Sequence, residues 1–376
     1  MSSGAEQAIG HLFEMRDVDT PVAILDLDVL EKNIESMAQL AREADVALRP
    51  HMKTHKITSL AWQQMRAGAC GLTCQKIGEA EVMIEAGIDD VLLATPVVGP
   101  VKIRRFLEIH RRARVTTVVD CLEAAAALGR AAEASGARVE ALLEVDTGLH
   151  RFGVSPKEAP RMAHVLAKEL VGIHFAGLIS YDGQLYDLIG AEDVDREAYR
   201  AYSLLVDTAD RVRSEGTPVM TVSVGGTSGG RMVSKCRGVT EYRPGNYIFN
   251  DLYQVGMGWA QVPQCALRVL STVVSAPSAD RAVVDAGAKL LSPATVPGRL
   301  GYGMLLGHED SRLEVLTDEH GIVTVPSTAR RFSVGELVWI VPNSNSAVMN
   351  LVDQVVAVRD GVVQCVLPVA ARGRVQ

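Results

Sequence analysis

The chain has 376 residues, of which 48% are apolar and 22% charged, and its formal net charge is −7. This composition predicts a globular protein with a core large enough for more than one domain. It argues against nucleic-acid binding, which usually needs a basic surplus. No apolar run reaches about 18 residues, and the first six residues do not resemble a secretory signal, so we expect a cytoplasmic protein that does not interact with membranes.

From residue 28 to residue 250, helix-like and strand-like segments alternate, which is typical of a parallel α/β fold. The first helix is predicted to begin at Asp28, with Leu30, Ile34, Met37 and Ala41 on its apolar face. The predicted strands are 46–48, 71–74, 91–94, 115–119, 139–145, 174–179, 219–224 and 240–243. The sequence therefore predicts a (β/α)8 TIM-type barrel over residues 27–262.

The last third of the chain has a different pattern, in which β-branched runs alternate with turns. Strands are predicted at 267–274, 282–285, 336–341 and 354–358. The sequence thus predicts a C-terminal β domain over residues 263–376, to which residues 1–26 are added. The boundary between the two domains is expected near Pro263.

The run RPHMKTHK (49–56) places Lys53 between two histidines, directly after the first predicted strand of the barrel. A lysine whose pKa is lowered by burial or by cationic neighbours is nucleophilic and can form a Schiff base with an aldehyde cofactor. Basic runs are also common as solvated turns or anion-binding segments. Taken alone, this run leaves both interpretations open.

Glycine-rich segments follow the seventh and eighth predicted strands. On a (β/α)8 barrel, functional groups lie at the carboxyl ends of the strands, and phosphate is commonly bound after strands seven and eight. Glycines let backbone N–H groups approach an anion, and a threonine hydroxyl adds a donor. We therefore predict a phosphate site on the same face as Lys53, made of Gly225, Gly226, Thr227, Gly245, Asn246 and Tyr247.

Several short motifs occur in a fixed order: DTPV (19–22), RPHMKTHK (49–56), CQKIGEA (74–80), EVDTG (144–148), RFG (151–153), GGT (225–227) and DAG (285–287). This ordered set resembles the D-threonine aldolase and D-serine dehydratase family of pyridoxal-phosphate enzymes, relatives of alanine racemase, from about Asp19 to about Gly361. The resemblance implies a barrel fold, pyridoxal 5'-phosphate attached to Lys53, pairing of residues 22–25 with the β domain, and a homodimer.

The resemblance also implies further contacts to the cofactor ring. Arg151 is expected near its phenolic side and Tyr181 near its pyridine nitrogen, with His51 and Gln75 as additional contacts. A tyrosine is a weak proton donor, so the ring would stabilise a carbanion only moderately. Without the resemblance, a surface ion pair for Arg151 and a half-buried ring for Tyr181 would be the simpler interpretations.

Two positions depart from the family. Its members hold a divalent metal with a histidine and, two residues later, a cysteine or aspartate, and the matching positions here are Ser344 and Ser346. Neutral hydroxyls are poor metal ligands, so we expect no divalent metal and a plain turn over residues 342–350. Asp182 stands where the resemblance implies histidine. It could accept the proton of a substrate hydroxyl, or it could only orient Lys or Arg side chains.

Three functions remain compatible with the sequence. The first is a lyase that cleaves or dehydrates a β-hydroxy-D-amino acid through a Schiff base on Lys53, and the similarity to lyases favours it. The second is an amino-acid racemase or epimerase, which needs no metal and is favoured by the missing ligands. The third is a non-catalytic protein that holds pyridoxal phosphate. In each case the expected partner is a small amino acid.

Overall fold

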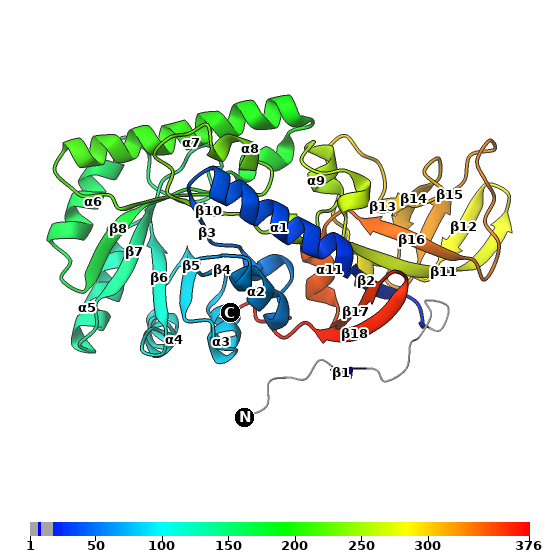
Figure 1. Cartoon of the computed structure of the whole chain (residues 1–376), viewed down its shortest axis with the longest axis horizontal. Helices are drawn as coiled ribbons and strands as arrows, with labels where there is room; N and C mark the ends of the chain where they lie inside the picture. Colours follow the sequence, from blue (N-terminus) through cyan, green and yellow to red (C-terminus); the bar gives the residue numbers. More distant parts are fainter. Residues whose placement is uncertain (1–6, 9–17) are drawn as a thin grey trace. The chain divides into compact units, whose positions relative to one another are not determined.

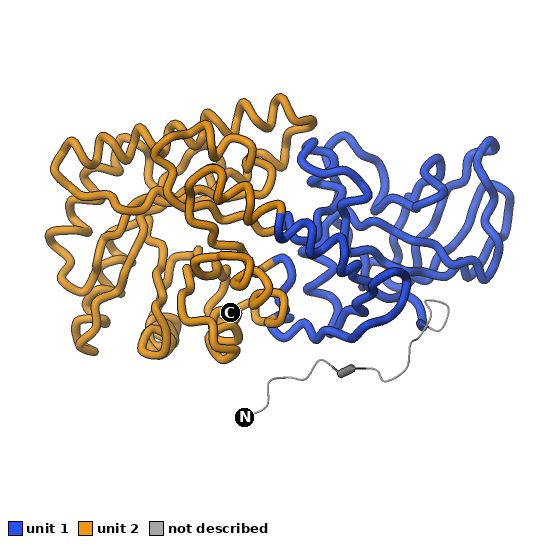
Figure 2. The backbone as a smooth tube through the Cα atoms, in the orientation of Figure 1, with its two compact units in different colours: residues 1–35, 54–57, 246–373 blue, residues 36–53, 58–245, 374–376 orange. Residues whose placement is uncertain are grey.

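The chain folds into two compact units in a computed structural model that describes residues 7–8 and 18–376 (Figure 2). Unit 1 contains the described residues up to Glu35, together with Thr54–Ile57 and Asn246–Gly373. Unit 2 contains Ser36–Lys53, Thr58–Gly245 and Arg374–Gln376. The predicted domain limits, 27–262 and 263–376 with 1–26, stay a prediction, and the first six residues used to argue against a secretory signal lie outside the described residues.

Unit 2 is built on an eight-stranded parallel sheet (Figure 1). Hydrogen bonds from the backbone N–H of Cys70 to Leu48 and of Thr73 to Pro50 join its two edge strands and close the sheet into a barrel. The eight strands predicted from the sequence are confirmed. They are β3 (Ala47–Leu48), β4 (Leu72–Cys74), β5 (Asp90–Pro96), β6 (Arg114–Val119), β7 (Val139–Glu144), β8 (Ile173–Ile179), β9 (Thr221–Gly225) and β10 (Glu241–Arg243), in the order β3-β10-β9-β8-β7-β6-β5-β4.

Helices alternate with these strands, as the sequence pattern predicts. The first helix, α1 (Leu27–Glu43), buries its predicted apolar face, since Leu30, Ile34, Met37 and Ala41 are all 6% exposed or less. The others are α2 (Thr58–Arg66), α3 (Ile77–Glu85), α4 (Pro100–His110), α5 (Leu122–Ala134), α6 (Ala159–Lys168), α7 (Ala191–Ser214) and α8 (Gly230–Val233), with short 3-10 helices η2 (Met52–Thr54) and η3 (Gly183–Asp187). No helix in the described part of the chain is long and apolar enough to cross a membrane.

Charged side chains cross the interior of the barrel as a connected series. Arg49, which follows β3, donates to Glu241 on β10 at 2.6 Å and to Asp90 on β5 at 2.5 Å. The other oxygen of Glu241 accepts a hydrogen bond of 2.6 Å from Ser223 on β9. A Cβ atom at Gly71 would lie only 2.2 Å from the Arg49 guanidinium and 2.6 Å from the Asp90 carbonyl oxygen, so this position requires glycine. These pairs tie four strands of the barrel together.

Unit 1 contains a ten-stranded sheet, most of it antiparallel. Within it, β2 (Val22–Asp26) pairs with β11 (Leu267–Ser278) and β17 (Gln354–Arg359), as predicted for residues 22–25. The four predicted strands of this region correspond to β11, β12 (Arg281–Val284), β16 (Leu337–Pro342) and β17. The sequence did not predict β1 (Gln7–Ala8), β13 (Gly303–Leu305), β14 (Arg312–Leu316), β15 (Gly321–Thr324) and β18 (Val362–Pro368).

The predicted plain turn over residues 342–350 is wrong, because the segment contains the helix α11 (Asn345–Leu351). Polar residues at its beginning resemble a turn in the sequence. In the structure, Asp251 accepts a hydrogen bond of 3.0 Å from the Asn345 backbone N–H, and Val348 and Met349 are completely buried. Tertiary packing thus stabilises the helix. The remaining short helices of unit 1 are η4 (Asn246–Ile248), α9 (Leu252–Gly256), η5 (Val262–Gln264) and α10 (Ala288–Leu291).

Replacing Arg49 by alanine is expected to lower the free energy of unfolding by about 3–5 kcal/mol, because it leaves Glu241 as an uncompensated buried charge. Urea denaturation followed by circular dichroism measures the loss. Arg114→Ala is the matched control: it pairs with the same Asp90, but its side chain is 61% exposed, so the expected loss is below about 1 kcal/mol. Equal losses in both variants would contradict the importance of the buried pairs.

Candidate functional site

Lys53 lies in η2, directly after β3, and its side chain is half-buried in unit 2. Its Nζ atom is 5.2 Å from the centroid of the Tyr181 ring, which follows β8. The guanidinium carbon of Arg151 is 5.1 Å from the same centroid. The structure therefore brings together three side chains that are up to 128 positions apart in the sequence (53 to 181) and that the sequence predicted to share one site.

The environment of Lys53 makes its amine easier to deprotonate. Burial is the largest cause, because an ammonium ion loses its hydration, and the positive charge of Arg151 acts in the same direction. The carboxylates of Glu79 and Asp182 partly oppose these effects. Together they lower the pKa of Lys53 to about 8, from an ordinary value of 10.5. Near physiological pH most of Lys53 is still an ammonium ion, but its neutral, nucleophilic fraction is far larger than that of an ordinary lysine.

His51 and Gln75 form a hydrogen-bonded pair close to the Lys53 backbone. The His51 Nε2 atom lies 3.2 Å from Oε1 of Gln75, whose amide nitrogen donates to the Ala94 carbonyl at 2.9 Å. Because that amide is oriented by Ala94, its oxygen accepts and Nε2 carries the proton. Burial, followed by the charge of Lys53, holds the pKa of His51 well below its usual value. His51 is therefore a neutral imidazole whose Nδ1 faces the Lys53 backbone N–H at 3.4 Å.

The glycine loop, residues 225–229, begins at the end of β9. Gly226 has a φ of +105°, a conformation that side chains disfavour, and a Cβ atom there would lie 2.1 Å from the Asp182 carboxyl group. A Cβ atom at Gly225 would be 3.0 Å from the Arg243 guanidinium. Thr227 is 2% exposed. The loop therefore requires glycine at its start because side chains of the barrel interior pack directly against its backbone.

The second predicted phosphate segment, residues 245–247, is divided between the two units. Gly245 follows β10 in unit 2, next to Pro244, whose carbonyl accepts a hydrogen bond of 2.9 Å from the His51 backbone N–H. Asn246 and Tyr247 belong to η4 of unit 1, where the Asn246 amide donates to Asp251 at 2.6 Å. A contribution of Asn246 and Tyr247 to the phosphate site stays a prediction.

Asp182 lies after β8, at the bottom of the glycine loop, and only 2% of it is exposed. Its Oδ2 atom accepts a hydrogen bond of 2.6 Å from the hydroxyl of Tyr202 on α7. Burial raises the pKa of Asp182 to about 7, although Tyr202 and the charges of Arg243 and Lys53 oppose the shift. Asp182 therefore exists in both protonation states near neutral pH.

Two charged residues of the site were missed by the sequence analysis. Arg243, at the end of β10, is 5% exposed and donates to the Ser180 carbonyl at 2.6 Å and to the Ser223 hydroxyl. Glu144, at the end of β7, is 6% exposed, and burial raises its pKa to about 7 against the opposing charges of Arg243 and Arg151. The available signal was a charged residue at the carboxyl end of a predicted barrel strand.

The two positions that the resemblance assigns to metal ligands lie in unit 1. Ser344 precedes α11, and Ser346 lies in its first turn, where its hydroxyl donates to Thr54 at 3.4 Å. Among residues 18–376, no group of three or more His, Cys, Asp or Glu side chains is arranged to hold a metal ion. Two other residues of ligand type, Asp187 and His308, lie elsewhere in the fold. Asp187 is at the end of η3, and the His308 ring contacts Glu336 at 2.9 Å and stacks on Phe332.

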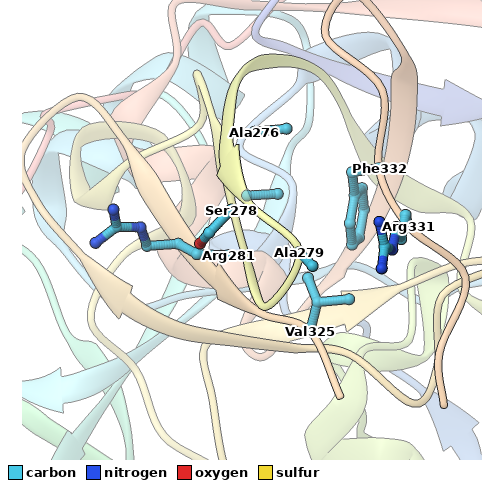
Figure 3. Close-up of a pocket in the computed structure, with 8 residues that line it drawn as sticks. Ala276, Ser278, Ala279, Arg281, Val325, Arg331 and Phe332 are labelled. Atoms are coloured by element: carbon cyan, nitrogen blue, oxygen red, sulfur yellow. The ribbon is translucent and has the colours of Figure 1, made fainter. Parts of the chain in front are cut away.

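A pocket of about 220 Å³ lies in unit 1 (Figure 3). Figure 3 shows Arg331 and Phe332 on one side of it and Ser278 and Ala279 on the other. None of the predicted site residues lines this pocket. It is therefore separate from the cluster around Lys53.

Comparison with known proteins gives a consistent assignment. Residues 25–252 match the model of the alanine racemase N-terminal domain, and residues 266–358 match the model of a putative serine dehydratase domain. The chain is 33% identical to D-threonine aldolase of Arthrobacter sp., covering 95% of this chain and 93% of that protein. It is 34% identical to D-threo-3-hydroxyaspartate dehydratase of Delftia sp. (strain HT23), covering 87% and 90%.

Solved structures agree with these sequence comparisons. The crystal structure of D-threonine aldolase from Filomicrobium marinum matches with a TM-score of 0.89 and 35% sequence identity, covering 98% of this chain and all of that chain. The fold thus agrees with the resemblance seen in the sequence. The chain belongs to the D-threonine aldolase and D-serine dehydratase family of pyridoxal-phosphate-dependent lyases, which has the alanine racemase-type barrel.

Proposed function

We propose that this protein is a lyase that cleaves or dehydrates a β-hydroxy-D-amino acid and that it needs no divalent metal. The single observation that carries the proposal is the cluster of Lys53, Arg151 and Tyr181, in which an amine of lowered pKa faces an aromatic ring and a cation. Similarity to a D-threonine aldolase and a D-threo-3-hydroxyaspartate dehydratase supports the substrate class, because both names denote β-hydroxy-D-amino acids. A homodimer and a cytoplasmic location stay predictions.

The residues of unit 2 fit pyridoxal 5'-phosphate. Lys53 offers an amine for its aldehyde, and the glycine loop, which has no side chains at residues 225 and 226, offers backbone N–H groups for its phosphate. When bound, this cofactor supplies an electron-withdrawing ring that accepts charge from the α-carbon of an amino acid. Lys53 and the glycine loop would hold it at its two ends, with Arg151, Tyr181, His51 and Gln75 around the ring.

The protonation states of these side chains suit that task. Burial, together with the neighbouring charge of Asp182, raises the pKa of Tyr181 to about 12, so its hydroxyl keeps its proton at physiological pH. Lys53 can release and accept a proton at Nζ near pH 8, and the neighbouring charges of Arg151 and Arg243 favour its neutral form. A role for Asp182 as the base toward a substrate hydroxyl stays a prediction, since its carboxyl group faces Tyr202 and the glycine loop.

Independence from a metal is supported by the donor atoms at the family's ligand positions. Ser344 and Ser346 present neutral hydroxyls, whereas divalent metals in proteins are bound mainly by imidazole, thiolate and carboxylate groups. The substrate hydroxyl would therefore have to be activated by protein groups alone. The same observation favours an amino-acid racemase as the second candidate, because loss of the α-proton requires no activation of a hydroxyl.

Borohydride reduction of the protein with bound cofactor, followed by peptide mapping, is expected to label Lys53 and no other lysine. Lys53→Met should abolish the label, whereas Lys56→Met, the control within the same basic run, should keep it. Because a neutral amine is the nucleophile and the pKa of Lys53 is lowered, the rate of cofactor attachment should rise through about pH 8 and then level off. A midpoint near 10.5 would contradict the lowered pKa.

Proton NMR in heavy water with a panel of D- and L-amino acids tests the reaction. With D-threonine, an aldolase releases glycine and acetaldehyde, and a dehydratase releases 2-oxobutyrate and ammonia. We expect one of these product pairs from a β-hydroxy-D-amino acid and none from its L-enantiomer. Exchange of the α-proton with racemisation alone would identify the isomerase, and unchanged spectra would identify a protein that only holds the cofactor.

Prolonged dialysis against a chelator is expected to leave the reaction rate unchanged, and added Mn²⁺ or Zn²⁺ should not increase it. The double variant S344H/S346D supplies an imidazole and a carboxylate at the family's ligand positions and should gain binding of one divalent ion, measured by elemental analysis after gel filtration. Loss of activity on chelation with recovery on metal addition would refute metal independence.

A further inference from the structure

Two buried tyrosine hydroxyls, one from the helix α7 and one from the strand β10, contact the glycine loop. Tyr242, on β10, lies 2.7 Å from the carbonyl oxygen of Gly226 and 3.0 Å from that of Thr227. Tyr202, on α7, lies 3.2 Å from the carbonyl oxygen of Gly225. Both tyrosines are 0% exposed. Three consecutive carbonyl oxygens of the loop thus lie within hydrogen-bond distance of two phenolic hydroxyl groups.

This arrangement decides where the N–H groups of the loop point. In a planar trans peptide, the C=O of one residue and the N–H of the next are directed oppositely. With the carbonyls of residues 225, 226 and 227 facing the two tyrosines, the N–H groups of residues 226, 227 and 228 face the other way. Successive N–H groups on one side of a loop are what an anion-binding loop requires.

Asp182 completes the support beneath the loop. A Cβ atom at Gly226 would lie 2.1 Å from its Oδ1 atom, and a Cβ atom at Gly229 would lie 2.7 Å from Oδ2 and 2.1 Å from the Tyr202 hydroxyl. The carboxyl group and the phenol therefore fill the space under both ends of the loop. No side chain at either glycine position could be accommodated without moving them.

The Tyr202 hydroxyl has one proton but two acceptors, Asp182 at 2.6 Å and the Gly225 carbonyl at 3.2 Å. Both contacts are satisfied together when Asp182 is protonated, donates to Tyr202 and leaves the phenolic proton for Gly225. The raised pKa of Asp182, about 7, is consistent with a substantial protonated fraction near neutral pH. A side chain that cannot donate at position 182 would leave the Tyr202 hydroxyl without the group that orients it toward Gly225.

We propose that Asp182 and Tyr202 are positioning residues that orient the peptide groups of the glycine loop toward the phosphate group of the cofactor, without touching that group themselves. The inference rests on the proposed function, because the loop must bind the phosphate of pyridoxal 5'-phosphate. It predicts that the two side chains contribute to affinity for the phosphate group and not to the reaction of Lys53 with an aldehyde.

The test compares binding of pyridoxal 5'-phosphate with binding of pyridoxal, which has the same aldehyde and no phosphate. Full-length protein stripped of cofactor is titrated with each compound, and absorbance reports attachment to Lys53. Tyr202→Phe is expected to weaken binding of pyridoxal phosphate about five- to ten-fold, the usual effect of one lost hydrogen bond, and to leave pyridoxal binding unchanged. Tyr199→Phe, half-exposed on the same helix, should change neither.

Substitutions at Asp182 separate hydrogen bonding from simple packing. Asp182→Asn can still donate to Tyr202 and should keep the affinity for pyridoxal phosphate. Asp182→Leu fills similar space but cannot orient the Tyr202 hydroxyl, so the affinity should fall, by less than in Tyr202→Phe because the phenol can still donate to Gly225. If Asn and Leu behave alike, the role of Asp182 is packing and the inference is overturned. If circular dichroism shows that Tyr202→Phe does not fold, the comparison of Asp182→Asn with Asp182→Leu tests the inference in its place.

Other outcomes have distinct meanings. An equal loss of affinity for pyridoxal phosphate and pyridoxal in Tyr202→Phe, or no loss for either, would refute the positioning role while leaving the proposed function intact. Failure of the unaltered protein to attach either compound at Lys53 would instead refute the proposed function. Normal cofactor affinity of Asp182→Asn with abolished turnover would assign Asp182 to the reaction as a base.

Discussion

The ionic series through the barrel interior, from Arg49 through Glu241 and Ser223 to Arg243, is the interaction on which the rest of the site depends. Charges buried in a protein are tolerated only when they are paired and hydrogen-bonded. Here Glu241 is paired with one arginine and linked through Ser223 to a second. Arg243 in turn donates to the Ser180 carbonyl, directly before Tyr181 and Asp182, and lies against Gly225. One guanidinium group thereby supports the ends of β8 and β9.

Burial also sets the protonation states of three ionisable side chains of the site, Lys53, Glu144 and Asp182. Desolvation lowers the pKa of Lys53 to about 8 and raises those of Glu144 and Asp182 to about 7. All three groups therefore titrate near physiological pH, although they belong to residue types whose ordinary pKa values are far apart. The site gains a nucleophilic amine and neutral carboxyl groups from one physical cause, the exclusion of water.

Unit 1 carries Ser344 and Ser346 at the two positions where the sequence resemblance places the family's metal ligands. Ser344 and Ser346 replace the ligand types, yet α11 is still anchored by the bond from Asn345 to Asp251 and by buried Val348 and Met349. The segment keeps its fold because its stability comes from these contacts and not from a metal ion.

The sequence by itself predicted the order of the barrel strands, the helix of residues 27–43 and Lys53 as the candidate nucleophile, because periodicity and strand-end position are local properties. Asp182 was singled out, but its place beneath Gly226 could not be predicted, since that contact depends on how β8, β9 and α7 pack. Arg243 and Glu144 escaped notice because a charged residue at a strand end becomes informative only when its burial is known. The helix α11 was missed because its polar start resembles a turn until Asp251, 94 positions earlier, supplies an acceptor.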